Sequence, residues 1–218
     1  MAIIIPATHE EWLEARKSIG IGASDAGSII GVNPWKSNVE LWREKTGLQE
    51  APDISDKRAV QIGNEEEPLI RALFAIENPE YQLTYESPYK IIRHDKYPFL
   101  FCTPDGELLE LATGLRGGLE IKTTEIQNPA QWKEWDNRIP QHYYAQCCHQ
   151  MIAAKWHFVI LKARIRFYRD GELRITERQY KITRREAMAD MKHILQSEIT
   201  FWDCVQKKKA PPLILPAI

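Results

Sequence analysis

Two short stretches decide the fold of this chain: Thr103-Pro104-Asp105-Gly106 and, further on, Glu120-Ile121-Lys122. In an extended strand alternate side chains share a face, so the glutamate and the lysine project together while the isoleucine between them points into the core. The connection through residues 114–118 is rich in turn residues, which allows the two strands to pair antiparallel. The aspartate and the glutamate would then project from neighbouring strands at one point.

The residue types at this point suit metal-dependent cleavage of a phosphodiester bond. Mg²⁺ prefers hard oxygen ligands, so we expect Asp105 and Glu120 as ligands, with the backbone carbonyl of Ile121 as a third oxygen. Lys122 would hold the attacking water, help to deprotonate it and offset the charge on the phosphate. The same residues allow a plainer interpretation, a salt bridge between Glu120 and Lys122 beside an ordinary Pro-Asp-Gly turn.

Two further residues are candidates for the same site. Glu67 stands early on a predicted helix, from which its carboxylate would reach a metal cluster. Gln146 stands near the start of another helix, where its amide would orient the lysine or the water. Each has a plainer alternative, because acidic residues complement the N-terminal end of a helix and a single polar residue often lies on an exposed face.

Length and composition describe one ordinary globular unit. A chain of 218 residues suits a single domain over 1–218, and 44% hydrophobic and 27% charged residues are usual for such a domain. No apolar run approaches the roughly 20 residues that span a bilayer, and residues 1–6 lack the basic region of a signal peptide. We therefore expect a cytoplasmic protein with no membrane contact.

The cysteines and the charges narrow the range of partners. Cys102, Cys147, Cys148 and Cys204 have no CxxC spacing, so we expect reduced thiols rather than disulfides or a four-cysteine zinc site. The net charge of −1 gives no overall attraction to nucleic acid, but residues 155–185 hold ten basic against three acidic residues. That asymmetry favours a local phosphate-binding face, with a solvated surface as the alternative.

Periodicity and turn residues predict an α+β chain. An N-terminal region, residues 8–47, should form helices from capping boxes at Thr8 and Ser37 and a short helix capped by Ser24. A core of about 56–207 follows, and 208–218 should form a non-helical tail, either flexible or docked on a neighbour. The elements expected in the core are a helix over 56–77 interrupted at Pro68, a meander of strands over 81–85, 89–93, 99–102, 107–111 and 118–123, a helix over 141–154, strands over 157–161, 165–168 and 173–178, and a last helix over 184–207.

The order of these segments resembles the lambda-exonuclease, or YqaJ-like, branch of the PD-(D/E)xK nucleases. The likeness extends from about Trp12 to Ala154 and so covers most of the chain. Six segments in this order are specific together. They are Trp12-Leu13-Glu14-Ala15-Arg16, Ile21-Gly22-Ala23-Ser24-Asp25-Ala26 with Gly31 and Leu41-Trp42, Gly63-xxx-Glu67-Pro68, Thr103-Pro104-Asp105-Gly106, Leu119-Glu120-Ile121-Lys122, and Tyr143-xx-Gln146 with His149-Gln150-Met151.

The resemblance implies a catalytic role for five matched residues. Asp105 and Glu120 would be metal ligands, and Lys122 would be the catalytic lysine. Glu67 would be the helix glutamate near the metals, and Gln146 the glutamine beside the lysine. The neighbouring glutamates at 65 and 66 leave the register of the helix glutamate open by one or two positions.

The resemblance also implies a grip on DNA ends. Arg16 and Ser24 match positions that hold a 5′-phosphate, which suits an arginine fork and a hydroxyl at a helix N-terminus. The chain departs from the family pattern at Thr103, where serine is usual, and at Cys148, where a second glutamine is frequent. Neither departure removes an expected metal ligand.

The fold and activity implied by the resemblance are specific. The fold would be the PD-(D/E)xK, restriction-endonuclease-like one, a central mixed β-sheet flanked by helices. The activity would be a 5′-to-3′ exonuclease that uses two Mg²⁺ ions per active site, with Mn²⁺ as a substitute, and degrades one strand of linear double-stranded DNA. The 3′ overhangs would serve phage-type single-strand-annealing recombination. The resemblance implies double-stranded DNA ends, a ring-shaped homotrimer and a single-strand annealing protein as partners, and a phage or prophage gene acting in a bacterial cytoplasm.

Three alternatives stand beside this interpretation: a PD-(D/E)xK endonuclease, a Cas4-like nuclease, and a non-catalytic DNA-end-binding protein on the same fold. Cas4-like proteins hold an iron–sulfur cluster with four cysteines, and the cysteine spacing here does not suit one. The set Glu67, Asp105, Glu120 and Lys122 argues against a non-catalytic protein. Cutting of closed circular duplex would favour an endonuclease.

Overall fold

The structure is a computed structural model that describes residues 2–214. Within these residues no helix has both the length and the apolar character needed to cross a membrane.

The strands are β1 (Ala2–Ile4), β2 (Ile21–Gly22), β3 (Tyr81–Thr84), β4 (Ile91–Arg93), β5 (Leu100–Cys102), β6 (Gly106–Glu110), β7 (Arg116–Ile126), β8 (Phe158–Arg169) and β9 (Glu172–Thr183). The helices are α1 (His9–Ile19), the 3₁₀ turn η1 (Ala23–Asp25), α2 (Ala26–Ile29), α3 (Asn38–Lys45), α4 (Arg58–Glu77), α5 (Pro129–Lys133), α6 (Gln141–Ala154) and α7 (Met188–Gln206).

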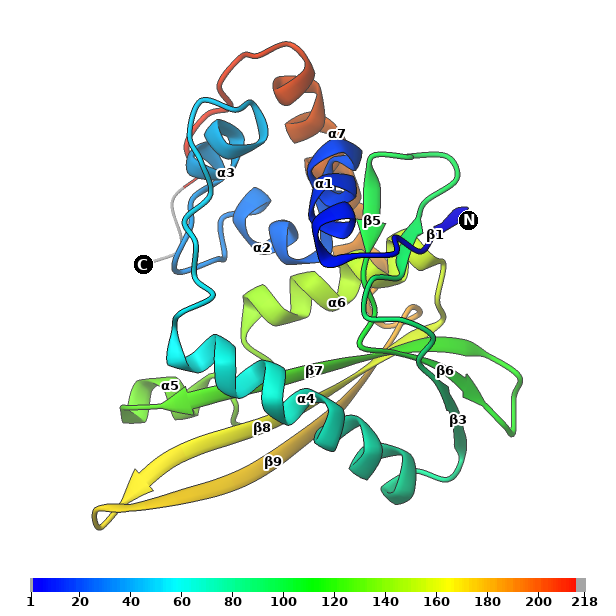
Figure 1. Cartoon of the computed structure of the whole chain (residues 1–218), viewed down its shortest axis with the longest axis vertical. Coiled ribbons are helices and arrows are strands. Elements are labelled where there is room, and N and C mark those ends of the chain that lie inside the picture. Colours follow the sequence, from blue (N-terminus) through cyan, green and yellow to red (C-terminus); the bar gives the residue numbers. More distant parts are fainter. Residues whose placement is uncertain (1, 215–218) are drawn as a thin grey trace.

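The larger sheet forms the centre of the molecule, with strand order β3-β6-β7-β8-β9. β7 and β8 are parallel, whereas the other neighbouring strands are antiparallel. Helix α4 lies across one face of this sheet and α6 lies on the other side (Figure 1). A mixed sheet flanked by helices was expected, and this expectation is confirmed.

Strand β7 sends its side chains alternately to these two helices. Leu119 and Ile121 belong to the apolar cluster that packs beneath α4 with Ile70 and Phe74. Glu120, between them, points to the opposite face, where it meets α6. The alternation predicted from the sequence is therefore correct, and it places a carboxylate between the sheet and a helix.

The predicted meander divides between two sheets. β4 and β5 leave it and form a smaller sheet of order β1-β4-β5-β2, whose other strands come from the N-terminal region. β5 is parallel to β2, and β4 is antiparallel to β1. The pairing partners lie far away in the sequence, so the local strand pattern could not reveal this division. The expected strands at 157–161 and 165–168 are also one strand, β8, because its pairing with β9 is continuous.

The helices follow their capping signals with three exceptions. Thr8 caps α1, and Ser37 forms a complete capping box with Glu40 at α3. Ser24 caps nothing: it lies inside the η1 turn, where Asp25 accepts a hydrogen bond from the backbone of Gly22. The other exceptions are α4, which is continuous through position 68, and α7, which begins at 188 instead of 184.

The tail packs on its own chain as far as it is described. Residues 209–214 are non-helical, as expected. The Asn38 side chain donates to the Pro212 carbonyl at 2.7 Å and accepts from the Ile214 backbone at 3.1 Å. These two bonds join the described part of the tail to α3. Residues 215–218 of the expected tail lie outside the described residues.

Candidate active site

The two decisive stretches meet as adjacent antiparallel strands. Gly106 pairs with Leu119 in an antiparallel ladder, so Asp105, before Gly106, lies opposite Glu120, after Leu119. Asp105 and Glu120 are therefore neighbours across the ladder. The Asp105 carboxylate accepts a hydrogen bond from the backbone of Ile121 at 2.8 Å. This bond ties the carboxylate to the strand that carries the predicted glutamate and lysine.

Glu120 is the most enclosed carboxylate of the site, with 2% of its surface exposed. Lys122 Nζ lies 2.6 Å from one of its oxygens, and the Gln146 amide donates to the same oxygen at 2.6 Å. The amide of Gln150 donates to the other oxygen. Lys122 and Gln146 therefore both contact Glu120, and Gln150, to which no role was assigned from the sequence, adds a third donor.

Glu67 approaches from α4, as the helix-glutamate assignment requires. Its carboxylate accepts from the guanidinium of Arg71, one turn later on the same helix. The same guanidinium donates from Nε to the backbone carbonyl of Asp105 at 2.6 Å. Arg71 therefore connects the helix to the turn that carries Asp105. Of the adjacent glutamates, Glu66 pairs instead with Arg166 on β8, whereas Glu67 lines the cleft.

The proximity of these groups shifts their pKa values. Burial, then the charges of Glu120 and Glu67, raise the pKa of Asp105 well above its ordinary value. Burial also raises the pKa of Glu67, with Arg71 opposing and Glu120 reinforcing the shift. Burial disfavours the charge of Lys122, but Glu120 and Asp105 outweigh it and raise the pKa of the lysine. The acidic groups therefore lie close together in a buried site of low dielectric constant. Because its pKa is raised, Lys122 stays protonated at neutral pH.

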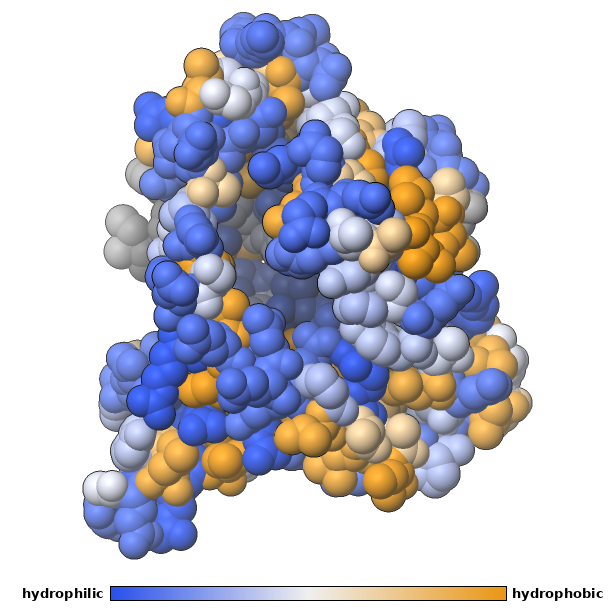
Figure 2. Space-filling view, in the orientation of Figure 1, coloured by the Kyte–Doolittle hydropathy of each residue, from blue (hydrophilic) through white to orange (hydrophobic). Residues whose placement is uncertain are grey.

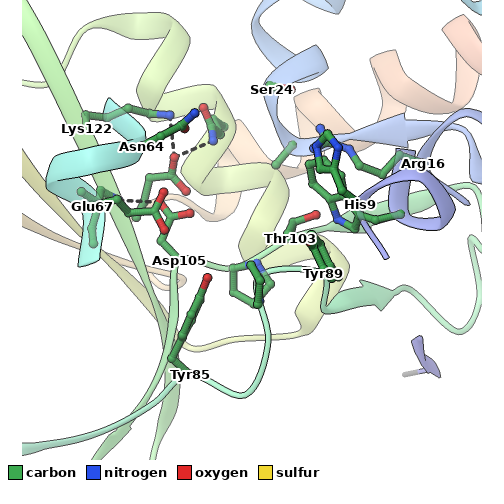
Figure 3. Close-up of a pocket in the computed structure, with 17 residues that line it drawn as sticks. His9, Arg16, Ser24, Asn64, Glu67, Tyr85, Tyr89, Thr103, Asp105 and Lys122 are labelled. Carbon is green, nitrogen blue, oxygen red and sulfur yellow. Dashed lines mark hydrogen bonds and ion pairs between the residues drawn. The ribbon is translucent and has the colours of Figure 1, made fainter. Parts of the chain in front are cut away.

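A cleft of about 450 Å³ is lined by Glu67, Asp105, Glu120, Lys122 and Gln146. Figure 2 shows the hollow between the α1 region and α4, with a largely hydrophilic rim. Lys122, Glu67 and Asn64 lie on one side of it, and Arg16 and Tyr89 lie on the other (Figure 3). The cleft therefore brings the predicted catalytic residues and the predicted phosphate anchor to one cavity.

The side of the cleft that carries Arg16, the predicted phosphate anchor, is aromatic and basic. Arg16 lies over the ring of Trp12, with its Cζ 4.3 Å from the ring centroid. Trp12 packs against His9 at 5.4 Å and Tyr89 at 6.2 Å between centroids. Burial lowers the pKa of Arg16, although nearby Asp25 opposes the shift. The guanidinium remains charged because its ordinary pKa is so high.

Ser24 lines the cleft near Arg16, but not in the way predicted. Its hydroxyl was expected at the N-cap of a helix, whereas it lies inside the three-residue turn η1. The N-cap position belongs to Gly22, whose backbone is bonded to Asp25. Any phosphate contact from Ser24 would therefore rest on the hydroxyl group and not on a helix terminus.

The donor chemistry of the cleft fits a divalent cation. Asp105, Glu120 and the Ile121 carbonyl offer hard oxygens on two rigid strands, and burial, followed by the charges of Glu120 and Glu67, raises the pKa of Asp105. In the present arrangement, residues 2–214 contain no three His, Cys, Asp or Glu side chains grouped closely enough to hold one ion. Lys122 and Arg71 take the carboxylate oxygens instead.

The sequence of the chain also matches a known family. The model of the YqaJ-like viral recombinase domain matches residues 11–157, which is more than half of the chain. The chain belongs to this family. It is 31% identical over 212 residues to the uncharacterized protein YqaJ of Bacillus subtilis (strain 168). That alignment includes 94% of the chain and 59% of the relative, so this family member spans well under two thirds of the relative's length.

Solved structures confirm the fold of this family member. An alkaline exonuclease from Laribacter hongkongensis, LHK-Exo, superposes with a TM-score of 0.63 at 20% identity, over 91% of this chain and 93% of that one. A phage-related exonuclease from Haemophilus somnus 129PT superposes with a TM-score of 0.53 at 16% identity, over 87% and 96%. At these identities the likeness establishes the shared architecture.

Two site residues were missed from the sequence, Gln150 and Arg71. Each stands four positions after a residue that was predicted, Gln146 and Glu67 respectively. Residues four apart on a helix share a face, so both missed side chains reach the same acidic point as their predicted neighbours. The helical spacing was the signal that would have found them.

The basic residues of 155–185 are mostly engaged within the chain. Lys162, Arg164 and Arg166 form ion pairs with glutamates of α4 and β9. Lys181 pairs with Glu110, and Arg184 donates to the Trp156 and Met151 carbonyls. The asymmetry of charge in this segment is therefore largely balanced by acidic groups from elsewhere.

Proposed function

We propose that this chain is a Mg²⁺-dependent exonuclease that degrades one strand of linear double-stranded DNA from its 5′ end and leaves 3′ single-stranded overhangs. One observation carries the proposal: Asp105, Glu120 and Lys122 share a cleft with Arg16 and Ser24. Acid ligands and a lysine suit hydrolysis of a phosphodiester, and a basic group across the cleft suits a terminal phosphate. Family membership and the exonuclease names of the solved structures support it.

The chain's own residues would divide the chemistry between them. Asp105, Glu120 and the Ile121 carbonyl, with Glu67, would hold two Mg²⁺ ions, or Mn²⁺ in their place. The bound cations would activate water and neutralise charge on the scissile phosphate. Lys122 would keep its proton and place its ammonium charge beside the phosphate oxygens, because its pKa is raised. Gln146 would keep Glu120 and Lys122 in register through its bond to the carboxylate.

The biological setting follows from the same proposal. The overhangs would be substrates for a single-strand annealing protein in phage-type recombination. A homotrimeric ring would let the enzyme encircle the duplex that it digests. Membership of a viral recombinase family supports the recombination setting.

Digestion of linear duplex DNA in the presence and absence of Mg²⁺ tests the activity. We expect Lys122→Ala to lower the rate on the order of 10³-fold, since a charge that stabilises the transition state is lost. DNA binding without divalent cations should persist. Lys192→Ala, an exposed lysine on α7, is the matched control and should leave the rate unchanged. A Lys122→Ala enzyme with near wild-type activity would contradict the catalytic assignment.

The same assay separates the alternatives. Cutting of closed circular duplex would replace the exonuclease by an endonuclease, and DNA binding without digestion would indicate a non-catalytic end-binding protein. A coloured protein containing iron would indicate a Cas4-like nuclease. Against that last outcome, Cys102, Cys147 and Cys148 are buried free thiols, and residues 2–214 contain no cysteine group able to hold a metal.

A further inference from the structure

Arg71 is a buried charge that the proposed chemistry does not use. Its side chain is 10% exposed, although arginine is rarely buried without a specific partner. It lies on α4, one turn after Glu67, and faces the cleft wall where Asp105 lies.

The guanidinium makes three contacts with three separate segments. One edge donates to the Glu67 carboxylate on α4, and Nε donates to the Asp105 carbonyl at 2.6 Å. Its flat face lies 3.5 Å from the ring centroid of Tyr85, which follows β3. The ring lies against the cation and covers that part of it.

Asp105 is consequently held at both ends. Arg71 binds its backbone carbonyl, and the Ile121 backbone binds its carboxylate. With the carbonyl and the carboxylate both fixed, the side chain loses most of its rotational freedom. The same guanidinium fixes Glu67, so one rigid planar group sets the separation of two carboxylates from different elements.

We propose that Arg71 is a positioning residue that preorganises Glu67 and Asp105 for a divalent cation, with Tyr85 as its cover. This inference rests on the proposed function of the site. Only an arginine has the required shape, because its fork reaches two acceptors at once, whereas a lysine ammonium is a point charge on a flexible stem. The plainer role, a tie that only stabilises the fold, makes a different prediction for cation binding.

Arg71→Lys tests the proposal, since it keeps the charge and removes the fork. Residues that orient metal ligands typically contribute about 10- to 100-fold in metal affinity. We expect the variant to weaken Mn²⁺ binding to the DNA-free protein by that factor, measured by calorimetry. The Mg²⁺ concentration for half-maximal digestion should rise in parallel, while DNA affinity without cations stays unchanged.

Arg93→Lys is the matched control. Arg93 also binds a backbone carbonyl through Nε and Nη2, at Pro98 and outside the cleft. It should leave Mn²⁺ affinity unchanged. An Arg71→Lys protein that melts earlier but binds Mn²⁺ as tightly as wild type would overturn the positioning role, and so would a wild-type protein that binds no Mn²⁺.

A second variant keeps the proposal testable if Arg71→Lys does not fold. Tyr85→Leu removes the ring and leaves the guanidinium in place, and we expect it to weaken Mn²⁺ binding by about three- to tenfold. Unchanged Mn²⁺ affinity in Tyr85→Leu would then overturn the proposal. If wild type binds Mn²⁺ but does not digest DNA, the proposed activity fails, whereas weaker binding in either variant would still support the positioning role.

Discussion

At the scale of single residues, the acidic centre depends on two adjacent strands that bring Asp105 beside Glu120, which Lys122 contacts at 2.6 Å. Asp105, Glu120 and Lys122 were found because strand alternation and one antiparallel turn fix their geometry from sequence alone. Gln150 and Arg71 were missed because their chemistry depends on what a helix face meets across the fold. Ser24 was assigned a cap because serine before a helix usually is one, but Asp25 takes over the backbone bond.

Arg16 carries the prediction about strand polarity. Its charged fork beside the cleft would bind a terminal phosphate, and hydrogen bonds to charged groups contribute about 1.5–3 kcal/mol, or roughly 10- to 100-fold. Wild type should therefore digest 5′-phosphorylated duplex faster than 5′-hydroxyl duplex, and Arg16→Ala should lose that preference. Lys17→Ala, the adjacent exposed basic residue on α1, is the control. Equal rates on both substrates in wild type would remove the anchor role.

His149 carries a prediction about pH. Its two ring nitrogens face the Glu198 carboxylate and the Phe101 carbonyl, and both partners only accept. A doubly protonated imidazole donates to both of them. Burial alone would lower its pKa, but Glu198 and the Phe101 carbonyl outweigh burial and raise it, with a smaller contribution from Asp25.

Because the folded pKa of His149 is raised, its contribution to stability is complete below the unfolded pKa of about 6.5 and is lost as pH rises through the folded value. Glu198→Gln removes the partner's charge. We expect the gap in melting temperature between wild type and this variant to be widest near pH 6 and to narrow at higher pH. A gap that is constant across this range would contradict a charged pair.

At the scale of elements, two strands of the predicted meander, β4 and β5, belong to the smaller sheet, whereas β3, β6 and β7 share the larger one. Local alternation identifies a strand, whereas its partners are set by contacts distant in sequence. β4 pairs with β1 and β5 pairs with β2, so both belong to the second sheet. The helices that flank the larger sheet were predicted nearly to their ends: α4 begins two residues later than expected, and α6 begins and ends as expected. Strand β7 was predicted over 118–123, whereas it spans Arg116–Ile126 and includes the glycines at 117 and 118 that were counted in the turn-rich connection.

Those glycines serve packing, which gives a stability prediction. A Cβ at Gly118 would lie 2.1 Å from the Trp156 ring, closer than real atoms approach. Gly118→Ala should therefore destabilise the protein by about 1–3 kcal/mol, as overpacking does. Gly63→Ala, in helix α4 with no atom within 4 Å of the added methyl, should instead stabilise by about 0.5–1 kcal/mol. Urea unfolding of both variants checks the opposite signs, and a stable Gly118→Ala would refute the close packing.

At the scale of the whole molecule, most cations of the segment 155–185 form ion pairs within the chain. The segment 155–185 was predicted as basic from its composition, but its cations are largely paired with glutamates that composition could not place beside them. The net charge of −1 adds no long-range attraction to DNA. A single copy would therefore hold a duplex mainly at the cleft, and loss of that contact between cycles would release the DNA.

A ring of three copies would prevent this release of DNA, because a ring that encircles the duplex retains it without a strongly basic surface. Light scattering at micromolar concentration should then give a mass near three times the 25.3 kDa of one chain.

Digestion of long duplex should also continue after a heparin trap is added, since topology rather than charge holds the substrate and bound enzyme does not exchange. Each protomer would present the same cleft to the central duplex, so one active copy in a ring of Lys122→Ala chains should still digest slowly but without early release. A monomer by light scattering, or digestion that the trap stops at once, would mean that the cleft alone retains DNA.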